Sequence, residues 1–157
     1  MWTKGINCLL ALGVAGAVGG LAGCSVGAGA PEGWKVMRGG SVVVAHPKVW
    51  EELHPTGVGA QASAVLRGEG GRPVGEITVW PGGATRPGVR PRAMTIGGRP
   101  AAQVGYVERT ADGGRNRVAE VTTTDSRGRP VLVRVIGPDV DGWPTELRKI
   151  VNSIDVD

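Results

Sequence analysis

Between residues 41 and 136 the chain carries short apolar runs that are separated by turn residues. In one run Ile77 and Val79 alternate with Glu76 and Thr78, the period of two that is typical of a half-exposed strand. Glycine-containing turns join the last three runs, which predicts an antiparallel meander. The pattern predicts about six strands, at residues 41–45, 62–67, 74–80, 101–109, 117–124 and 131–136.

The end of the chain follows a different period. Leu147, Ile150, Val151 and Ile154 are spaced i, i+3, i+4 and i+7, which places them on one stripe of a helix. Pro144 suits the first turn of that helix. The sequence therefore predicts the α+β class: an antiparallel sheet packed by a C-terminal amphipathic helix.

The N-terminus is an uncharged apolar run that follows a single lysine, Lys4. No charged residue occurs in 5–31, and the run ends in Leu21-Ala22-Gly23-Cys24. This ending resembles the lipobox of bacterial lipoproteins. The resemblance implies that residues 1–23 are a signal peptide, and that Cys24 becomes the lipid-bearing first residue of the mature protein.

An uncleaved membrane anchor is an alternative, because the apolar run is long enough to span a bilayer. A plain secreted protein is a second alternative. Five glycines weaken the run as a spanning helix, since each lowers helix propensity: Gly13, Gly16, Gly19, Gly20 and Gly23. The short positive start and the small residues before Cys24 favour the lipoprotein.

After Cys24 the chain divides into a tether and one domain. Residues 24–33 are small and nearly uncharged, which predicts a flexible tether, and 34–157 form a single α+β domain. The formal net charge of the full chain is +4, too diffuse to indicate nucleic acid as a partner. We expect a monomer without a cofactor. Phenylalanine is absent, and four tryptophans are expected to fill its place in the core: Trp34, Trp50, Trp80 and Trp143.

The order of these elements resembles small actinobacterial lipoproteins with the PsbP-like α/β fold. The resemblance covers residues 34–157 and rests on Pro47-Lys48-Val49-Trp50, Gly98-Arg99-Pro100-Ala101 and Val151-Asn152-Ser153-Ile154. It implies that the antiparallel sheet is curved, and it implies a binding or assembly-accessory role without a shared catalytic centre. It transfers no site residues. It also implies a helix near Trp50, which His54-Pro55 would stop early.

One segment contains residues of the kind that bind metal. His46, Glu51, Glu52 and His54 lie within nine residues, and a partly helical segment would put both histidines on the same side. A solvated polar loop with an acidic pair explains the same residues, and the spacing does not match a zinc motif. His46 and His54 are therefore weak candidates for metal ligands.

A long loop is expected at residues 81–93, which are rich in Gly, Pro and Arg. Arg86, Arg90, Arg92 and Arg99 concentrate positive charge around it. They are weak candidate contacts for anionic lipid, wall polymer or a protein partner, and an exposed, solvated loop is the preferred explanation of the same residues.

The preferred function is a non-catalytic binding or accessory protein of the cell envelope, held by the lipid on Cys24 at the outer face of the cell membrane. Its partner is an envelope protein or ligand that the sequence does not name. No Gly-x-Ser-x-Gly motif occurs, and we expect no catalytic residue.

Two alternative functions remain open. A metal-dependent or hydrolytic enzyme using the His46–His54 segment is one alternative. A carrier that holds a hydrophobic ligand between sheet and helix is another.

Overall fold

The computed structural model describes residues 30–55 and 58–157. The expected signal peptide 1–23, the expected lipidation site Cys24 and the larger part of the expected tether 24–33 lie outside these ranges. In the described part of the chain, no helix has the length and apolar character that crossing a membrane requires.

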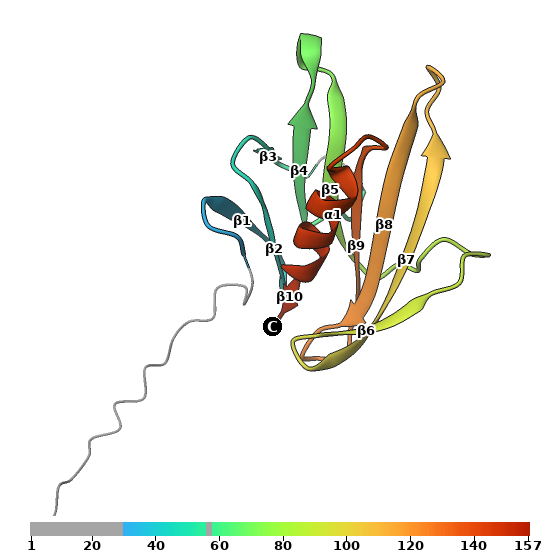
Figure 1. The fold of residues 1–157 in the computed structure, drawn as a ribbon. Helices are drawn as coiled ribbons and strands as arrows, with labels where there is room; N and C mark the ends of the chain where they lie inside the picture. Colours follow the sequence, from blue (N-terminus) through green and yellow to red (C-terminus); the bar gives the residue numbers. More distant parts are fainter. Residues whose placement is uncertain (1–29, 56–57) are drawn as a thin grey trace, which may run out of the picture.

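One antiparallel sheet of seven strands forms most of the domain (Figure 1). Its strand order is β3-β4-β5-β9-β8-β7-β6. The predicted meander is confirmed, because β7, β8 and β9 pair in succession. The strands are β3 (Glu51–Leu53), β4 (Ala62–Arg67), β5 (Pro73–Pro81), β6 (Arg92–Ile96), β7 (Arg99–Arg109), β8 (Arg115–Thr124) and β9 (Pro130–Pro138), and a short 3-10 turn, Glu69–Gly71, links β4 to β5.

A smaller sheet and one helix complete the domain (Figure 1). The smaller sheet has the order β1-β2-β10, formed by β1 (Trp34–Gly39), β2 (Val42–Pro47) and β10 (Asp155–Val156). Helix α1 (Trp143–Asn152) packs on β9 and β8 of the large sheet and on β2. We call the face of the large sheet under α1 the inner face. The predicted α+β class, a curved antiparallel sheet packed by a C-terminal helix, is confirmed.

The core lies on the inner face because alternate residues of every strand point to it. Val79 of β5 and Val121 of β8 both lie opposite Val133 of β9, and all three are fully buried. The helix contributes the stripe that the sequence predicts: Leu147, Ile150, Val151 and the following Ile154 are buried.

Two tryptophans hold the first turn of α1 on the sheet. Trp50 lies between β2 and β3, and its ring stacks on that of Trp143 with centroids 6.0 Å apart and an interplanar angle of 15°. Both side chains are buried, as expected, whereas Trp34 and Trp80 are only partly buried. Gly75 of β5 and Gly137 of β9 leave room for them. A Cβ on Gly137 would overlap the Trp143 ring, and one on Gly75 would lie 3.1 Å from the Trp50 ring.

A buried serine holds the other end of α1. The Oγ of Ser153 accepts the Ala45 N–H of β2 at 2.9 Å and donates to the Ile150 carbonyl at 2.7 Å. The helix is therefore fixed at both ends, on the large sheet by Trp143 and on the small sheet by Ser153.

Two local expectations are wrong. Trp50 does not belong to a short helix: its N–H bonds to the Pro47 carbonyl at 3.0 Å in a turn, and the next residues form β3 against β4. The long loop ends before residue 93, because Arg92 starts β6 and pairs with Gln103. Strands β1, β3, β6 and β10 were not predicted, since none carries a sustained apolar alternation.

Replacing Gly137 with Ala should destabilise the fold. The added methyl group would displace the rigid Trp143 ring, so we expect the free energy of unfolding to fall by about 1–3 kcal/mol, the usual cost of overpacking. Urea denaturation followed by tryptophan fluorescence measures the change.

Gly105→Ala is the matched control, because a Cβ on this β7 glycine would meet nothing closer than the Val118 carbonyl at 3.8 Å. Its stability should equal or slightly exceed that of the wild type. Equal stability of Gly137→Ala and wild type would contradict the packing role of Gly137.

Candidate functional site

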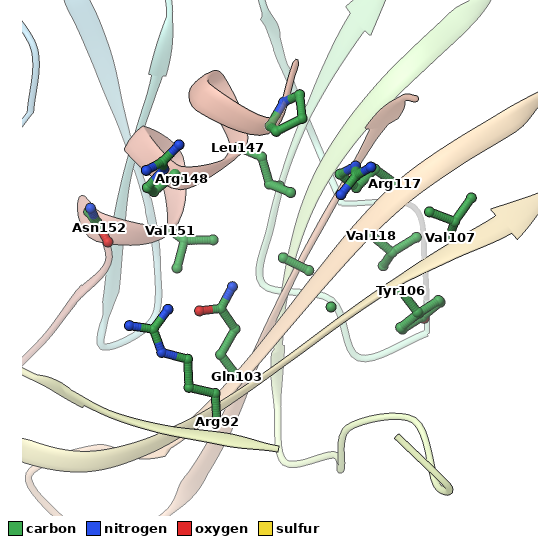
Figure 2. A pocket seen from close by; sticks show the side chains of 13 residues that line it. Arg92, Gln103, Tyr106, Val107, Arg117, Val118, Leu147, Arg148, Val151 and Asn152 are labelled. Carbon is green, nitrogen blue, oxygen red and sulfur yellow. The ribbon is translucent and has the colours of Figure 1, made fainter. Parts of the chain in front are cut away.

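A groove of about 600 Å³ lies between α1 and the inner face of β6, β7 and β8. Figure 2 shows Arg92 and Gln103 extending toward the helix from the strands, and Leu147 and Val151 extending toward the strands from the helix. The apolar part of the lining also includes Val107 and Ala119, and its polar part also includes Arg117, Arg148 and Asn152. The groove thus offers an apolar floor beside a polar, cationic rim.

The groove exists because α1 covers only part of the inner face. The helix packs mainly on β9, β8 and β2, while β7 lies one strand farther out. On β7, Gly105 contributes no side chain and Val107 remains 38% exposed. The strand therefore forms an open wall opposite the helix.

The groove is positively charged. Arg117 donates to Asp139 at 2.8 and 3.0 Å, and Asp139 also pairs with Arg115 at 3.1 Å. Arg92 and Arg148 form no ion pair with any residue in 30–55 or 58–157, and no described carboxylate lines the groove. Two guanidinium groups are therefore available to an anionic ligand.

A second hollow of about 270 Å³ continues along the helix toward its C-terminal end. It shares Val151 and Asn152 with the groove and adds Met94 and Ile96 of β6. The accessible surface is therefore an elongated track beside α1, suited to an extended ligand.

The opposite, outer face of the sheet carries the chain segment 82–91. At its start the Gly82 N–H bonds to the Pro130 carbonyl at 2.6 Å. Farther along, the Arg86 N–H donates to Glu120 Oε2 at 2.6 Å, and the Arg86 guanidinium lies 4.7 Å from the centre of the Tyr106 ring. The segment is thus docked across β9, β8 and β7.

Glu120 anchors this segment. It is only 7% exposed, and its Oε1 accepts the Tyr106 hydroxyl at 2.8 Å and lies 3.4 Å from Arg134 Nε. Burial first, and then the hydrogen bond to Glu120, raises the pKa of Tyr106 above its ordinary value of 10.0.

The four arginines singled out in the sequence are not gathered in one site. Arg92 lines the groove, whereas Arg86 docks on the outer face. Arg99 donates to the Asp125 carbonyl at 3.2 Å, and Arg90 is exposed in the loop.

Sequence reasoning missed two groove residues, Arg117 and Arg148. Arg148 and Asn152 flank the apolar helical stripe at i, i+4, which is a usable signal, but Arg117 joins them only through the sheet register.

The candidate metal ligands have different surroundings. His46 is fully buried in β2, with Nδ1 3.0 Å from the Pro47 carbonyl and Nε2 3.4 Å from Glu52 Oε1. His54 is exposed after β3. The segment is two strands and a turn, so the helical spacing considered for the histidines does not apply. Within the described ranges, no three His, Cys, Asp or Glu side chains are placed to hold one metal ion.

Replacing Glu120 with Gln should lower the pKa of Tyr106. Removing the carboxylate charge makes the phenolate less unfavourable, so the pKa should move from its raised value toward 10.0. Because Tyr106 is the only tyrosine of the chain, the tyrosinate absorbance reports it directly.

Circular dichroism recorded at each pH verifies that both proteins stay folded during the titration. Glu76→Gln, on β5, is the control and should leave the titration of Tyr106 unchanged. An unchanged pKa in Glu120→Gln would contradict the assigned contact.

Comparison with models of known protein families gives no match, and comparison with curated proteins gives none. Solved structures do match. The structure of LpqN, described as involved in cell envelope biogenesis of Mycobacterium tuberculosis, matches with a TM-score of 0.52 and 17% identity over 78% of this chain and 90% of LpqN. The solution structure of PsbP (CyanoP) from Synechocystis sp. PCC 6803 matches with a TM-score of 0.54 and 12% identity over 90% of this chain and all of that protein.

A third match is a protein of Bacteroides thetaiotaomicron, with a TM-score of 0.50 and 14% identity over 79% of this chain. This chain spans about half of that protein, 48% of its length. At sequence identities this low, the structural matches establish the architecture of this chain but not its ligand or partner. The chain therefore has a PsbP-like fold.

Proposed function

We propose that this chain is a lipid-anchored, non-catalytic binding or accessory protein of the cell envelope, and that the groove beside α1 is its binding site. The observation that carries the binding role is the open groove with an apolar floor, in which Arg92 and Arg148 have no described carboxylate partner. A site of this kind recognises an anionic group and an apolar group together.

The anchoring part of the proposal rests on the N-terminus. Leu21-Ala22-Gly23-Cys24 closes an apolar run of the right kind for a lipoprotein signal, and the first strand begins ten residues later at Trp34. Acylation with two chains gives stable membrane attachment, where a single chain is marginal. The folded domain would then work at the outer face of the membrane.

The two alternative functions have less support. An enzyme built on His46 and His54 would need both side chains in one accessible site, but His46 is fully buried. A carrier of a hydrophobic ligand would need a closed apolar cavity, whereas the groove is open and bordered by three arginines. A binding surface for a partner at the membrane fits these observations better.

Replacing Cys24 with Ala should abolish processing and acylation of the chain. With full-length chain expressed in a bacterium, the wild type should sediment with the membrane fraction, and its intact mass should match an acylated chain that begins at Cys24. Cys24→Ala should carry no lipid mass and keep its leader, whose apolar run is long enough to hold the unprocessed chain in the membrane. Cys8→Ala is the matched control and should have the mass of the processed, acylated wild type. An acylated mass in Cys24→Ala, or an unmodified mass in the wild type, would refute the anchor.

The groove should also make the contacts to a partner in living cells. A photo-crosslinking amino acid at Asn152, an exposed position on the groove, should give a defined adduct that disappears when Arg148→Glu is added. The same amino acid at Asp112, exposed in the β7–β8 turn, is the control and should not give it. An adduct common to both positions would count against the groove.

A further inference from the structure

One edge of β7 is only partly covered by its neighbour. Strand β7 runs over Arg99–Arg109, but β6 pairs with it only from Arg99 to Gln103. On the other side β8 pairs with β7 as far as Arg109. Residues 104–109 therefore have a strand on one side and, among the described residues, none on the other.

The hydrogen-bond pattern identifies the free backbone groups. In the β7–β8 turn the Thr110 N–H bonds to the Gly114 carbonyl at 3.0 Å, which fixes the phase of the antiparallel ladder. Bonded pairs alternate with non-bonded pairs along such a ladder. Counting back from Thr110, the N–H and C=O groups of Gly105, Val107 and Arg109 point away from β8. No described backbone group bonds to them.

The chain bypasses this edge although it has enough residues to cover it. Strand β6 starts directly after Pro91, which has no N–H to offer a ladder. The preceding segment 82–91 instead crosses the outer face and is fixed there by the bond from the Arg86 N–H to Glu120. The edge is therefore left open by a docked segment of the same chain.

The free edge forms one wall of the groove. Gly105 and Val107 line the groove and also carry the free backbone groups. A strand added beside them would continue the line of β6, and its alternate side chains would point to the inner face. There they would meet open space above Gly105, the apolar side chain of Leu147, and the guanidinium groups of Arg92 and Arg148.

We propose that the groove binds an extended acidic peptide segment of a partner protein, which adds as a strand to the free edge of β7. This rests on the proposed binding role of the groove and names its ligand class. The main chain of the segment would pair with Gly105, Val107 and Arg109, and its inward acidic side chains would pair with Arg92 and Arg148.

Two other occupants fit less well. A second copy of the chain, paired β7 to β7, would bring its Arg109 and groove arginines against those of the first copy, and like charges across strands are destabilising. A lipid headgroup could pair with the arginines but would leave the strand edge without partners. The backbone groups select a peptide.

The test uses protein purified in a neutral detergent and labelled for amide NMR. The probe acetyl-Thr-Glu-Thr-Leu-Thr-Glu-Thr-amide should shift the amides of Gly105 and Val107 and slow their hydrogen exchange. A peptide with Lys in place of Glu should not bind. A probe that is N-methylated at both Glu and at Leu should bind at least about tenfold more weakly, because these nitrogens would face β7.

Two protein variants separate the backbone from the side chain. Val107→Pro removes an N–H that points to the free edge and does not serve β8, so it should weaken binding about tenfold. Val107→Ala shortens the same side chain but keeps the N–H, so it should weaken binding clearly less than Val107→Pro does. Equal losses in the two variants would assign the effect to the side chain and contradict pairing at the edge. If Val107→Pro fails to fold, the N-methylated probe still tests the same contact on the wild-type protein.

The possible outcomes distinguish the occupants. Equal binding of the plain and N-methylated probes overturns strand addition, as does a failure of the plain probe to bind. Groove shifts with dodecyl phosphate but not with the peptide would assign a lipid headgroup instead. A concentration-dependent dimer in sedimentation, with Val107 and Gly105 protected in the absence of peptide, would assign a second copy. If the in-cell adduct at Asn152 persists in any of these cases, the groove keeps its binding role and only the ligand class is wrong.

Discussion

The stack of Trp50 on Trp143 is the contact on which the arrangement of the two layers depends. It joins the β2–β3 connection to the first turn of α1, and both rings lie against the sheet where Gly75 and Gly137 have no side chains. An aromatic pair of this kind contributes about 0.5–1.5 kcal/mol beyond the apolar area it buries. Its larger effect is geometric, because it fixes which strands the helix can cover.

The groove follows from that geometry. With Trp143 held over β9 and Ser153 bonded to β2, α1 packs on the middle of the sheet and stops short of β7. Strands β6 and β7 are then separated from the helix by a gap. Side chains of these two strands and of α1 line that gap, which is the groove. The site is therefore a consequence of where the helix is pinned.

The sequence predicts the parts of this fold that depend on local periodicity. The helical stripe from Leu147 to Ile154 and the β7–β8–β9 meander could be read because apolar spacing and glycine turns report burial directly. The residues that line the groove could not be predicted from local periodicity. Arg92 and Arg148 lie more than fifty residues apart in the chain and meet only through strand pairing and helix docking. The turn at Trp50 was also missed, because tertiary stacking and not local propensity holds it.

An open strand edge is usually a hazard, because it can pair with any other edge. The domain limits that hazard by charge instead of by covering the edge. Arg109 lies on the edge itself, Arg92 is the first residue of the neighbouring strand β6, and neither has a described carboxylate partner. The same arginines that repel a second copy attract an acidic strand. Protection from self-association and selectivity for a partner thus arise from one set of charges.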